Sequence, residues 1–171
     1  PVGAFQLQSM SHPAGTLDMD RPLPAVVKYA LQYLFVQAEF GLMCPISVTD
    51  TSIHLIRTFA SAELKNYLLP KMLSGDVAML WKGTQFMTER AGGSDVGAIE
   101  TVARYEDGVW RLYGDKWFCS HAAADVALLL ARPECPPGGT PGLPLFALPP
   151  PVKQRPPHPP PPGHPHAHTP P

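Results

Sequence analysis

The spacing of apolar residues changes near residue 77, and this change constrains the fold more than any other feature of the chain. Before it, apolar side chains recur every three or four residues, as on one face of a helix. From Val77 onward they alternate, as in strands with one buried face. The sequence therefore predicts helices followed by strands, which is an α+β organisation.

Three helices are expected in the first part of the chain. The first covers residues 25–43, has a wide apolar face and should stop near Gly41 and Pro45. The second covers residues 49–59.

The third helix should begin after Ser61, a favourable N-cap residue. It should end by Leu69, because Pro70 disfavours helical backbone in the residue before it.

The second part of the chain predicts strands bounded by turn residues. These strands are expected at 77–81, 99–105, 109–113, 115–120 and 125–131, and residues 142–148 also have a strand-like pattern. The run Glu106-Asp107-Gly108 between two alternating segments indicates a β-hairpin.

Proline dominates the end of the chain. Twelve of the 23 prolines and four of the seven histidines lie in residues 149–171, where missing backbone donors exclude helices and sheet ladders. We expect a disordered or polyproline-II tail, which is either an aberrant terminus such as a frameshift product or an adventitious metal binder. The expected units are a partial helical domain (1–76), a β domain (77–148) and this tail (149–171); no metal site is assigned.

Charge and cysteine usage exclude several classes of protein. The net charge is -1 and no basic block is present, so the composition does not indicate a polyanion or a membrane surface as partner. Three widely spaced cysteines fit a reducing, cytoplasmic location better than a disulfide framework. Because the chain opens with Pro1 and lacks a signal-peptide pattern, we interpret it as a piece of a longer protein.

Two short segments contain residues suited to binding a large ligand. Thr88 and Ser94 supply hydroxyls on either side of Gly92-Gly93, whose backbone can expose N–H groups to a phosphate or a ring edge. Trp117 offers a flat ring suited to aromatic packing. Taken alone, the first segment is more typical of an ordinary tight loop, and the indole more typical of a core residue.

Together, these segments have a more specific meaning. The run Met87-Thr88-Glu89 through Gly93-Ser94-Asp95, followed by Gly114-x-Lys116-Trp117-Phe118, resembles the flavin-binding segments of acyl-CoA dehydrogenases, and most of all their AidB-like, adaptive-response branch. The resemblance covers roughly residues 12–148. It implies an N-terminal helical domain followed by an antiparallel β middle domain, with the C-terminal helical bundle absent. It also implies FAD as cofactor and acyl-CoA as substrate.

The resemblance assigns site residues by position. Trp117 would pack beside the isoalloxazine, and Gly93 and Ser94 would lie along the pyrophosphate or the pantetheine. Cys119 stands where many members have threonine, so a main-chain N–H or the Ser120 hydroxyl must supply that contact. The full set of expected flavin contacts is Gln85, Met87, Thr88, Gly93, Ser94, Trp117, Phe118, Cys119 and Ser120.

No catalytic residue is expected in this chain. In the family a glutamate from the C-terminal bundle removes the α-proton, and neither Glu89 nor Glu134 matches its position. The leading hypothesis is an inactive fragment of an enzyme that dehydrogenates acyl-CoA thioesters and is a homo-oligomer when complete. The alternatives are an AidB-like flavoprotein that binds DNA and protects it from alkylation, and a non-catalytic scaffold piece.

Overall fold

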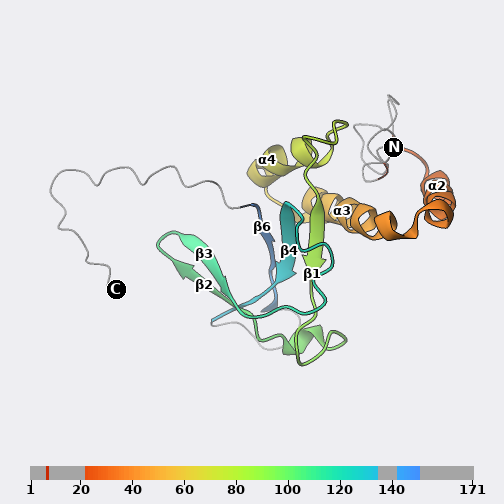
Figure 1. Ribbon diagram of the computed structural model, residues 1–171. Helices are drawn as coiled ribbons and strands as arrows, with labels where there is room; N and C mark the ends of the chain where they lie inside the picture. The colour runs from red at the N-terminus through yellow and green to blue at the C-terminus, as the bar shows by residue number, and fades with distance from the viewer. Residues whose placement is uncertain (1–6, 8–21, 135–141, 151–171) are drawn as a thin grey trace, which may run out of the picture.

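The computed structural model describes residue 7 and residues 22–134 and 142–150. Its α-helices precede its strands, which confirms the α+β class (Figure 1). The helices are α2 (Ala25–Ala38), α3 (Phe40–Phe59) and α4 (Ala62–Met72). The strands are β1 (Gly83–Phe86), β2 (Val102–Glu106), β3 (Val109–Tyr113), β4 (Val126–Leu130), β5 (Arg132–Pro133) and β6 (Leu145–Leu148), with a short 3-10 helix, η2 (Val96–Ala98), before β2. The expected tail over 149–171 lies outside the described residues, except for residues 149–150.

The boundary between the first two helices differs from the prediction. The backbone breaks at Glu39, whose carboxylate accepts a hydrogen bond from the Leu42 N–H and caps α3. α3 then continues through Pro45, where the sequence predicts a stop. A continuous α3 keeps Ile46, Thr49, Ile53 and Ile56 on one buried face, so packing overrides the local effect of proline.

The third helix begins as expected and ends later than expected. The Ser61 hydroxyl accepts from the Leu64 N–H at 3.3 Å, which confirms the N-cap. The predicted end at Leu69 is wrong, because α4 continues through Pro70 to Met72. Leu68 and Met72, four residues apart, are both fully buried on one side of this helix, and that burial holds the last turn in place.

Two predicted strands are absent. Residues 77–81 form turns, in which the Asp76 carboxylate accepts from the Ala78 N–H at 2.9 Å, and β1 begins only at Gly83. Residues 115–120 are also irregular, because Phe118 has φ 51°. The predicted hairpin is confirmed: Asp107 and Gly108 both have positive φ, at 52° and 81°, as a tight turn between β2 and β3 requires.

The described strands form two three-stranded sheets, with orders β1-β4-β6 and β3-β2-β5. β2–β3 and β4–β6 are antiparallel, whereas β1–β4 and β2–β5 are parallel. The expected antiparallel β domain is confirmed, and the structure adds these two parallel pairs to it. Parallel neighbours need a long connection between them, and the connection from β1 to β4 contains both segments singled out for ligand binding.

The main core lies between α3, α4 and the β1-β4-β6 sheet. Figure 1 shows the helices gathered on one side of this sheet, with the β2–β3 hairpin projecting away from them. The buried members of this core are Ile53, Ile56, Leu68, Met72, Val126 and Leu128. Full burial of such a side chain is worth about 1.5–3 kcal/mol, so the core fixes β1 beneath α3 and thereby places the residues that follow β1. None of the helices in the described part has the length and hydropathy needed to cross a bilayer.

Candidate functional site

The two segments singled out in the sequence lie side by side. The Trp117 N–H donates to the Thr88 carbonyl at 2.8 Å, although the two residues are 29 positions apart along the β1–β4 connection. This hydrogen bond places the indole-bearing loop against the start of the diglycine bend. The structure therefore brings together the two parts that the resemblance assigns to one ligand.

The bend itself is closed by its own backbone. Glu89 and Gly92 exchange two hydrogen bonds, of 3.3 and 3.0 Å, and Gly92 adopts φ 121°. Gly93 lies so close to Thr88 that a Cβ there would stand 2.8 Å from the Thr88 hydroxyl oxygen. Residues 90–95 are exposed around this bend, so Gly93 and Ser94 are accessible to a ligand.

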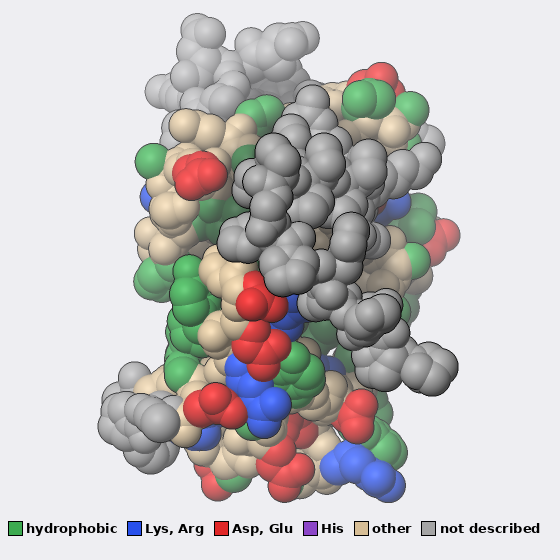
Figure 2. Space-filling model, turned by 90° about the vertical axis from the view of Figure 1, so that its left-hand side faces the viewer, with side chains coloured by type: hydrophobic (Ala, Val, Ile, Leu, Met, Phe, Trp, Pro, Cys, Tyr) green, Lys and Arg blue, Asp and Glu red, His purple; other side chains and the backbone are tan. Residues whose placement is uncertain are grey.

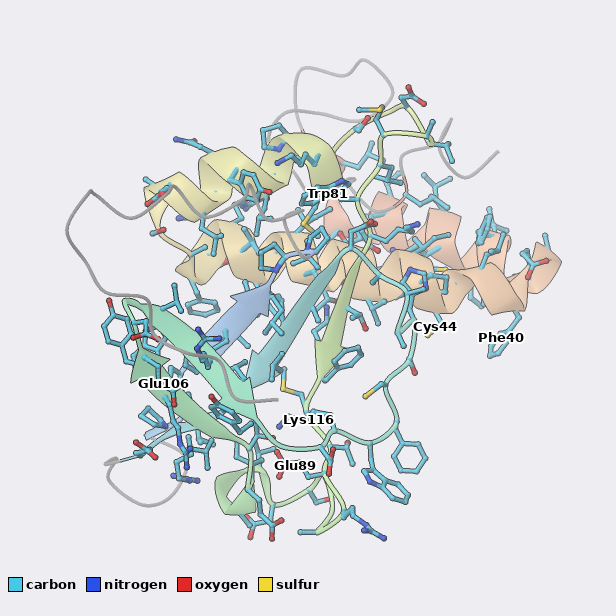
Figure 3. The ribbon with its side chains drawn as sticks, turned by 60° about the vertical axis from the view of Figure 1, so that its left-hand side comes forward. Phe40, Cys44, Trp81, Glu89, Glu106 and Lys116 are labelled. Carbon is cyan, nitrogen blue, oxygen red and sulfur yellow. The ribbon has the colours of Figure 1, made fainter. Side chains whose placement is uncertain are left out.

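A buried ion pair lies behind the bend. Lys116 Nζ stands 2.5 Å from Glu89 Oε1, and the two side chains are only 8% and 5% exposed (Figure 3). Glu89 also accepts from the Thr101 hydroxyl at 2.5 Å, from the Thr101 N–H at 3.2 Å and from the Glu100 N–H at 2.5 Å. One carboxylate thus joins the bend, the segment before β2 and the segment before Trp117.

These contacts set the ionisation of Glu89. Burial alone raises the pKa of its carboxyl, but the hydrogen bonds from Lys116, Thr101 and the Glu100 N–H, together with the positive charge of Lys116, outweigh burial. They lower the pKa from 4.5 to about 2. Glu89 therefore remains a carboxylate at any pH near neutrality, and four donors occupy it.

A pH dependence of stability follows from this shift. Because the folded-state pKa of Glu89 is depressed, its contribution is complete above its ordinary pKa and is lost as the pH falls through the folded value. We expect the free energy of unfolding to lose on the order of 3 kcal/mol between about pH 5 and about pH 2 through this group. Urea unfolding at a series of pH values measures the loss.

Two variants isolate the contribution of Glu89 from that of other carboxyls. Glu89→Gln should flatten the dependence on pH, since the amide does not titrate. Glu63→Gln, which changes an exposed carboxylate in the first turn of α4, should keep the slope of the parent protein. Equal slopes in all three proteins would show that Glu89 contributes nothing below pH 5.

Two aromatic rings beside the bend are open to solvent. Trp117 is 46% exposed and Phe118 is 83% exposed, with ring centroids 6.4 Å apart. The guanidinium of Arg90 lies 5.6 Å from the Trp117 ring centroid. Trp117 is thus not a core residue, and the surface next to Thr88 combines flat apolar rings with one cation.

The segment after Trp117 is held in an unusual conformation. Phe118 and His121 both have positive φ, at 51° and 57°, which is rare for residues other than glycine. The Ser120 N–H donates to the Phe118 carbonyl, and the Ser120 carbonyl accepts from the Thr84 hydroxyl at 2.7 Å. Cys119 donates its thiol to the Lys116 carbonyl at 3.4 Å. β1 thus fixes this turn, which explains why it is not a strand.

The remaining expected contacts point elsewhere. Gln85 donates its amide N–H groups to the Val48 carbonyl and the Ser52 hydroxyl of α3, at 2.6 and 2.5 Å. Met87 lines an apolar hollow that also contains Leu130. The side-chain N–H groups of Gln85 are therefore committed to α3, away from Trp117.

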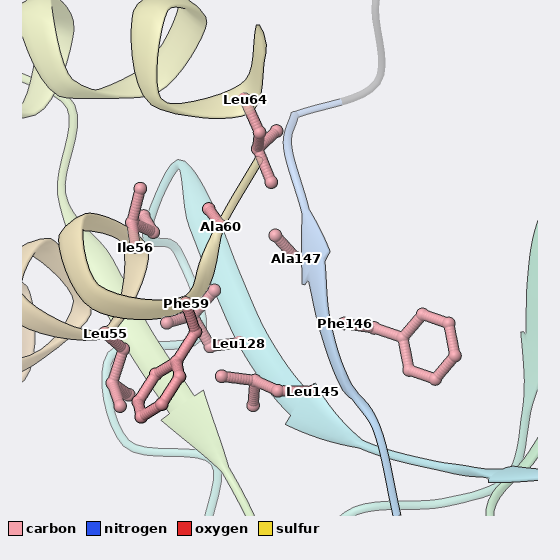
Figure 4. A pocket seen from close by; sticks show the side chains of 9 residues that line it. All are labelled: Leu55, Ile56, Phe59, Ala60, Leu64, Leu128, Leu145, Phe146 and Ala147. Carbon is pink, nitrogen blue, oxygen red and sulfur yellow. The ribbon is translucent and has the colours of Figure 1, made fainter. Parts of the chain in front are cut away.

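An apolar pocket lies between the end of α3, the start of α4, β4 and β6 (Figure 4). The volume of this pocket is about 70 Å³. Its lining residues, which include Phe59, Leu64 and Ala147, have no polar side chain among them. Leu55, Phe59 and Leu145 line both this pocket and the hollow at Met87. Within the described ranges, no group of three or more His, Cys, Asp or Glu residues is arranged to hold a metal ion.

Sequence reasoning missed the roles of Glu89, Lys116 and Thr101. Glu89 and Lys116 lie beside residues that the sequence analysis identifies, and Thr101 lies in an expected strand. A single charged residue in a loop is normally solvated, so none of the three stands out. Their pairing depends on the fold, because 27 positions separate Glu89 from Lys116. The one signal present is position: the acid follows Thr88 directly, and the lysine precedes Trp117 directly.

The chain is similar to known proteins in sequence. Residues 84–168 match the family model described as "Acyl-CoA dehydrogenase, middle domain". "Acyl-CoA dehydrogenase family member 11" of Caenorhabditis elegans is 35% identical over 125 residues, which are 68% of this chain and 20% of that protein. "3-methylmercaptopropionyl-CoA dehydrogenase" of Ruegeria pomeroyi is 34% identical over 150 residues, 83% of this chain and 24% of the relative. "Putative acyl-CoA dehydrogenase AidB" of Escherichia coli is 35% identical over 116 residues, 63% of this chain and 20% of the relative.

Solved structures resemble the chain as well. Caenorhabditis elegans ACDH-11 in complex with C11-CoA gives a TM-score of 0.70 at 28% identity, over 86% of this chain and 26% of that one. A glutaryl-CoA dehydrogenase from Mycobacterium smegmatis in complex with FADH2 gives 0.61 at 27% identity, over 74% of this chain and 31% of that one. The chain spans about a fifth to a quarter of the length of the curated relatives it matches.

Proposed function

We propose that this chain supplies the flavin-binding part of a FAD-dependent acyl-CoA dehydrogenase, because residues 84–168 match the family model of the acyl-CoA dehydrogenase middle domain. The observation that supports this most directly is the hydrogen bond from the Trp117 N–H to the Thr88 carbonyl, because it joins the two segments that would share one cofactor. Homologous structures named as complexes with FADH2 or with C11-CoA support FAD and acyl-CoA as the ligands.

The residues present fit such a cofactor. A flat ring system needs an exposed aromatic surface, and Trp117 and Phe118 provide one. A pyrophosphate needs exposed backbone N–H groups without large side chains in the way. The Gly92 N–H is bound to the Glu89 carbonyl, so the exposed backbone of Gly93 and Ser94 would make this approach. Thr88 and Ser94 would add hydroxyl donors on either side of this approach.

When bound, FAD would accept the β-hydrogen of an acyl-CoA thioester as hydride while the α-proton is removed. The described residues would bind this cofactor and hold it in position. Glu89, the acid beside Thr88, is not a suitable base, because four donors occupy its carboxylate and hold its pKa at about 2. We therefore propose that this chain binds flavin and does not by itself turn over acyl-CoA.

Titration with FAD tests the proposal. The anisotropy and quenching of flavin fluorescence should report binding to the full chain, and Trp117→Ala should weaken it at least about tenfold, because the variant loses both ring burial and aromatic contact. Trp110→Ala is the matched control: this indole is 51% exposed, yet it packs between Tyr105 and Phe146 in the β2–β3 region. Equal weakening by both variants, or no binding by the parent chain, would contradict the proposal.

The AidB-like branch and its DNA-binding role have no specific support here. The relative named AidB is 35% identical, and the other two relatives are 35% and 34% identical. The net charge is -1, and the face shown in Figure 2 has acidic and basic side chains interspersed rather than a basic field. Phosphate binding needs such a field, so a salt-dependent shift of duplex DNA by this chain would contradict our preference for the flavin role.

A further inference from the structure

The Glu89–Lys116 pair holds the two ligand segments from behind. Glu89 follows Thr88 directly and Lys116 precedes Trp117 directly, so in both segments the ion pair lies one residue from the Trp117–Thr88 hydrogen bond. The two bonds together fix both the separation and the relative rotation of these segments. Figure 3 shows Glu89 and Lys116 close together, just beyond the end of β1.

The carboxylate has no remaining freedom of orientation. Lys116 and the Thr101 groups bind Oε1, and the Glu100 N–H binds Oε2. Gly114 packs closely against Thr101, since a Cβ on Gly114 would stand 2.8 Å from the Thr101 Cα. The bend, residues 100–101 and the segment of Lys116 therefore meet at Glu89, and among its described donors the charge is carried by Lys116.

Stability alone does not explain a charged pair at this place. Replacing a buried ion pair with well-packed apolar residues is often neutral or stabilising. Directional hydrogen bonds, in contrast, define one orientation where apolar packing permits several. Trp117 follows Lys116 directly and its N–H is bound to Thr88, so the direction of its exposed ring depends on that orientation.

We propose that Lys116 and Glu89 are positioning residues, which hold the Trp117 ring against the Thr88–Gly93 bend in the orientation that binds the flavin. The inference rests on the proposed function, since the ligand is the flavin of that site. It adds that the affinity for the cofactor depends on two side chains that do not touch it.

The test is a set of substitutions at Lys116, with FAD as the probe and the full chain as the protein. Lys116→Met keeps the length of the side chain and removes its charge and donors. We expect it to weaken FAD binding by about tenfold or more, whereas Lys116→Arg, which can still donate to Glu89, should recover most of the affinity. Glu89→Gln should weaken binding in the same direction, because it retains the shape and loses the charge.

Lys82→Met is the matched control. Lys82 forms an ion pair with Asp125 at 3.8 Å. Both side chains of this pair are partly exposed, and the pair lies at the other end of β1. Its removal should leave FAD affinity unchanged. Urea unfolding of each variant establishes that every titration is made on folded protein.

A second measurement separates positioning from general support of the fold. If Lys116 acts through Trp117, then Lys116→Met should cost little further affinity when Trp117 is already alanine. Equal losses in the presence and absence of the indole, or a loss of stability without a loss of affinity, would overturn the inference. If Lys116→Met binds FAD as tightly as the parent chain does, this inference alone is overturned. If the parent chain binds no FAD, the proposed function is overturned and this inference with it.

Discussion

Gly83→Ala is expected to destabilise the protein by about 3 kcal/mol. Gly83 begins β1 directly against α3, where an added Cβ would stand 2.4 Å from the Ser52 Cβ and 2.8 Å from the Met72 Cε. Ser52 and Met72 are fully buried, so neither can move aside without disturbing the core. Urea unfolding followed by circular dichroism measures the loss.

Gly41→Ala is the control for Gly83→Ala. A Cβ on Gly41 approaches only the flexible carboxylate of Glu39, at 3.1 Å, and the position is helical and exposed. Its effect should stay within about 1 kcal/mol. A second test uses Ser52→Gly in the Gly83→Ala background, which removes the clashing Cβ and should recover part of the stability. A protein that tolerates Gly83→Ala as well as Gly41→Ala would show that α3 and β1 are not in close contact.

Asp50→Ala is expected to cost about 3 kcal/mol, because it removes the carboxylate that pairs with the buried ammonium group of Lys28. Lys28 on α2 is only 5% exposed and forms an ion pair with Asp50 of α3. The pair links two helices that otherwise meet along partly exposed faces. Thermal and urea unfolding of the variant give the cost.

The double variant Lys28→Met/Asp50→Leu distinguishes a lost countercharge from lost packing. Replacing both charges with apolar groups of similar size should return stability to within about 1.5 kcal/mol of the parent. Glu134→Ala is a second control, since Glu134 pairs with Arg104 where both side chains are about half exposed, and such pairs contribute about 0–1 kcal/mol. A double variant as unstable as Asp50→Ala would assign the loss to packing instead.

The contact of α3 with β1 and the ion pair of α3 with α2 both influence the position of the candidate site, because α3 holds β1 in place. α3 contacts β1 at Gly83 and at Gln85, whose side chain binds the Val48 carbonyl and the Ser52 hydroxyl of α3. β1 then leads within two residues to Thr88, and its Thr84 hydroxyl binds the Ser120 carbonyl. A shift of α3 relative to β1 would therefore move both ligand segments together.

Local patterns in the sequence predict much of the backbone correctly. The N-cap at Ser61 and the Asp107-Gly108 turn depend on neighbours a few residues away, and both are confirmed. The order of helices and strands follows from apolar spacing, and it is confirmed as well. The predicted stops at Pro45 and Pro70 are wrong, because burial of α3 and α4 residues in the core outweighs the local preference of proline.

The sequence by itself determined which residue types are available to a ligand: a diglycine bend with flanking hydroxyls, and an indole some way along the chain. Only the tertiary structure decided that Thr88 and Trp117 touch, that Gln85 turns to α3, and that Glu89 is bound by Lys116 rather than free to act as a base. The physical reason is that turns and caps depend on contacts between near neighbours, whereas these pairings form across about 30 residues and exist only once the core has closed.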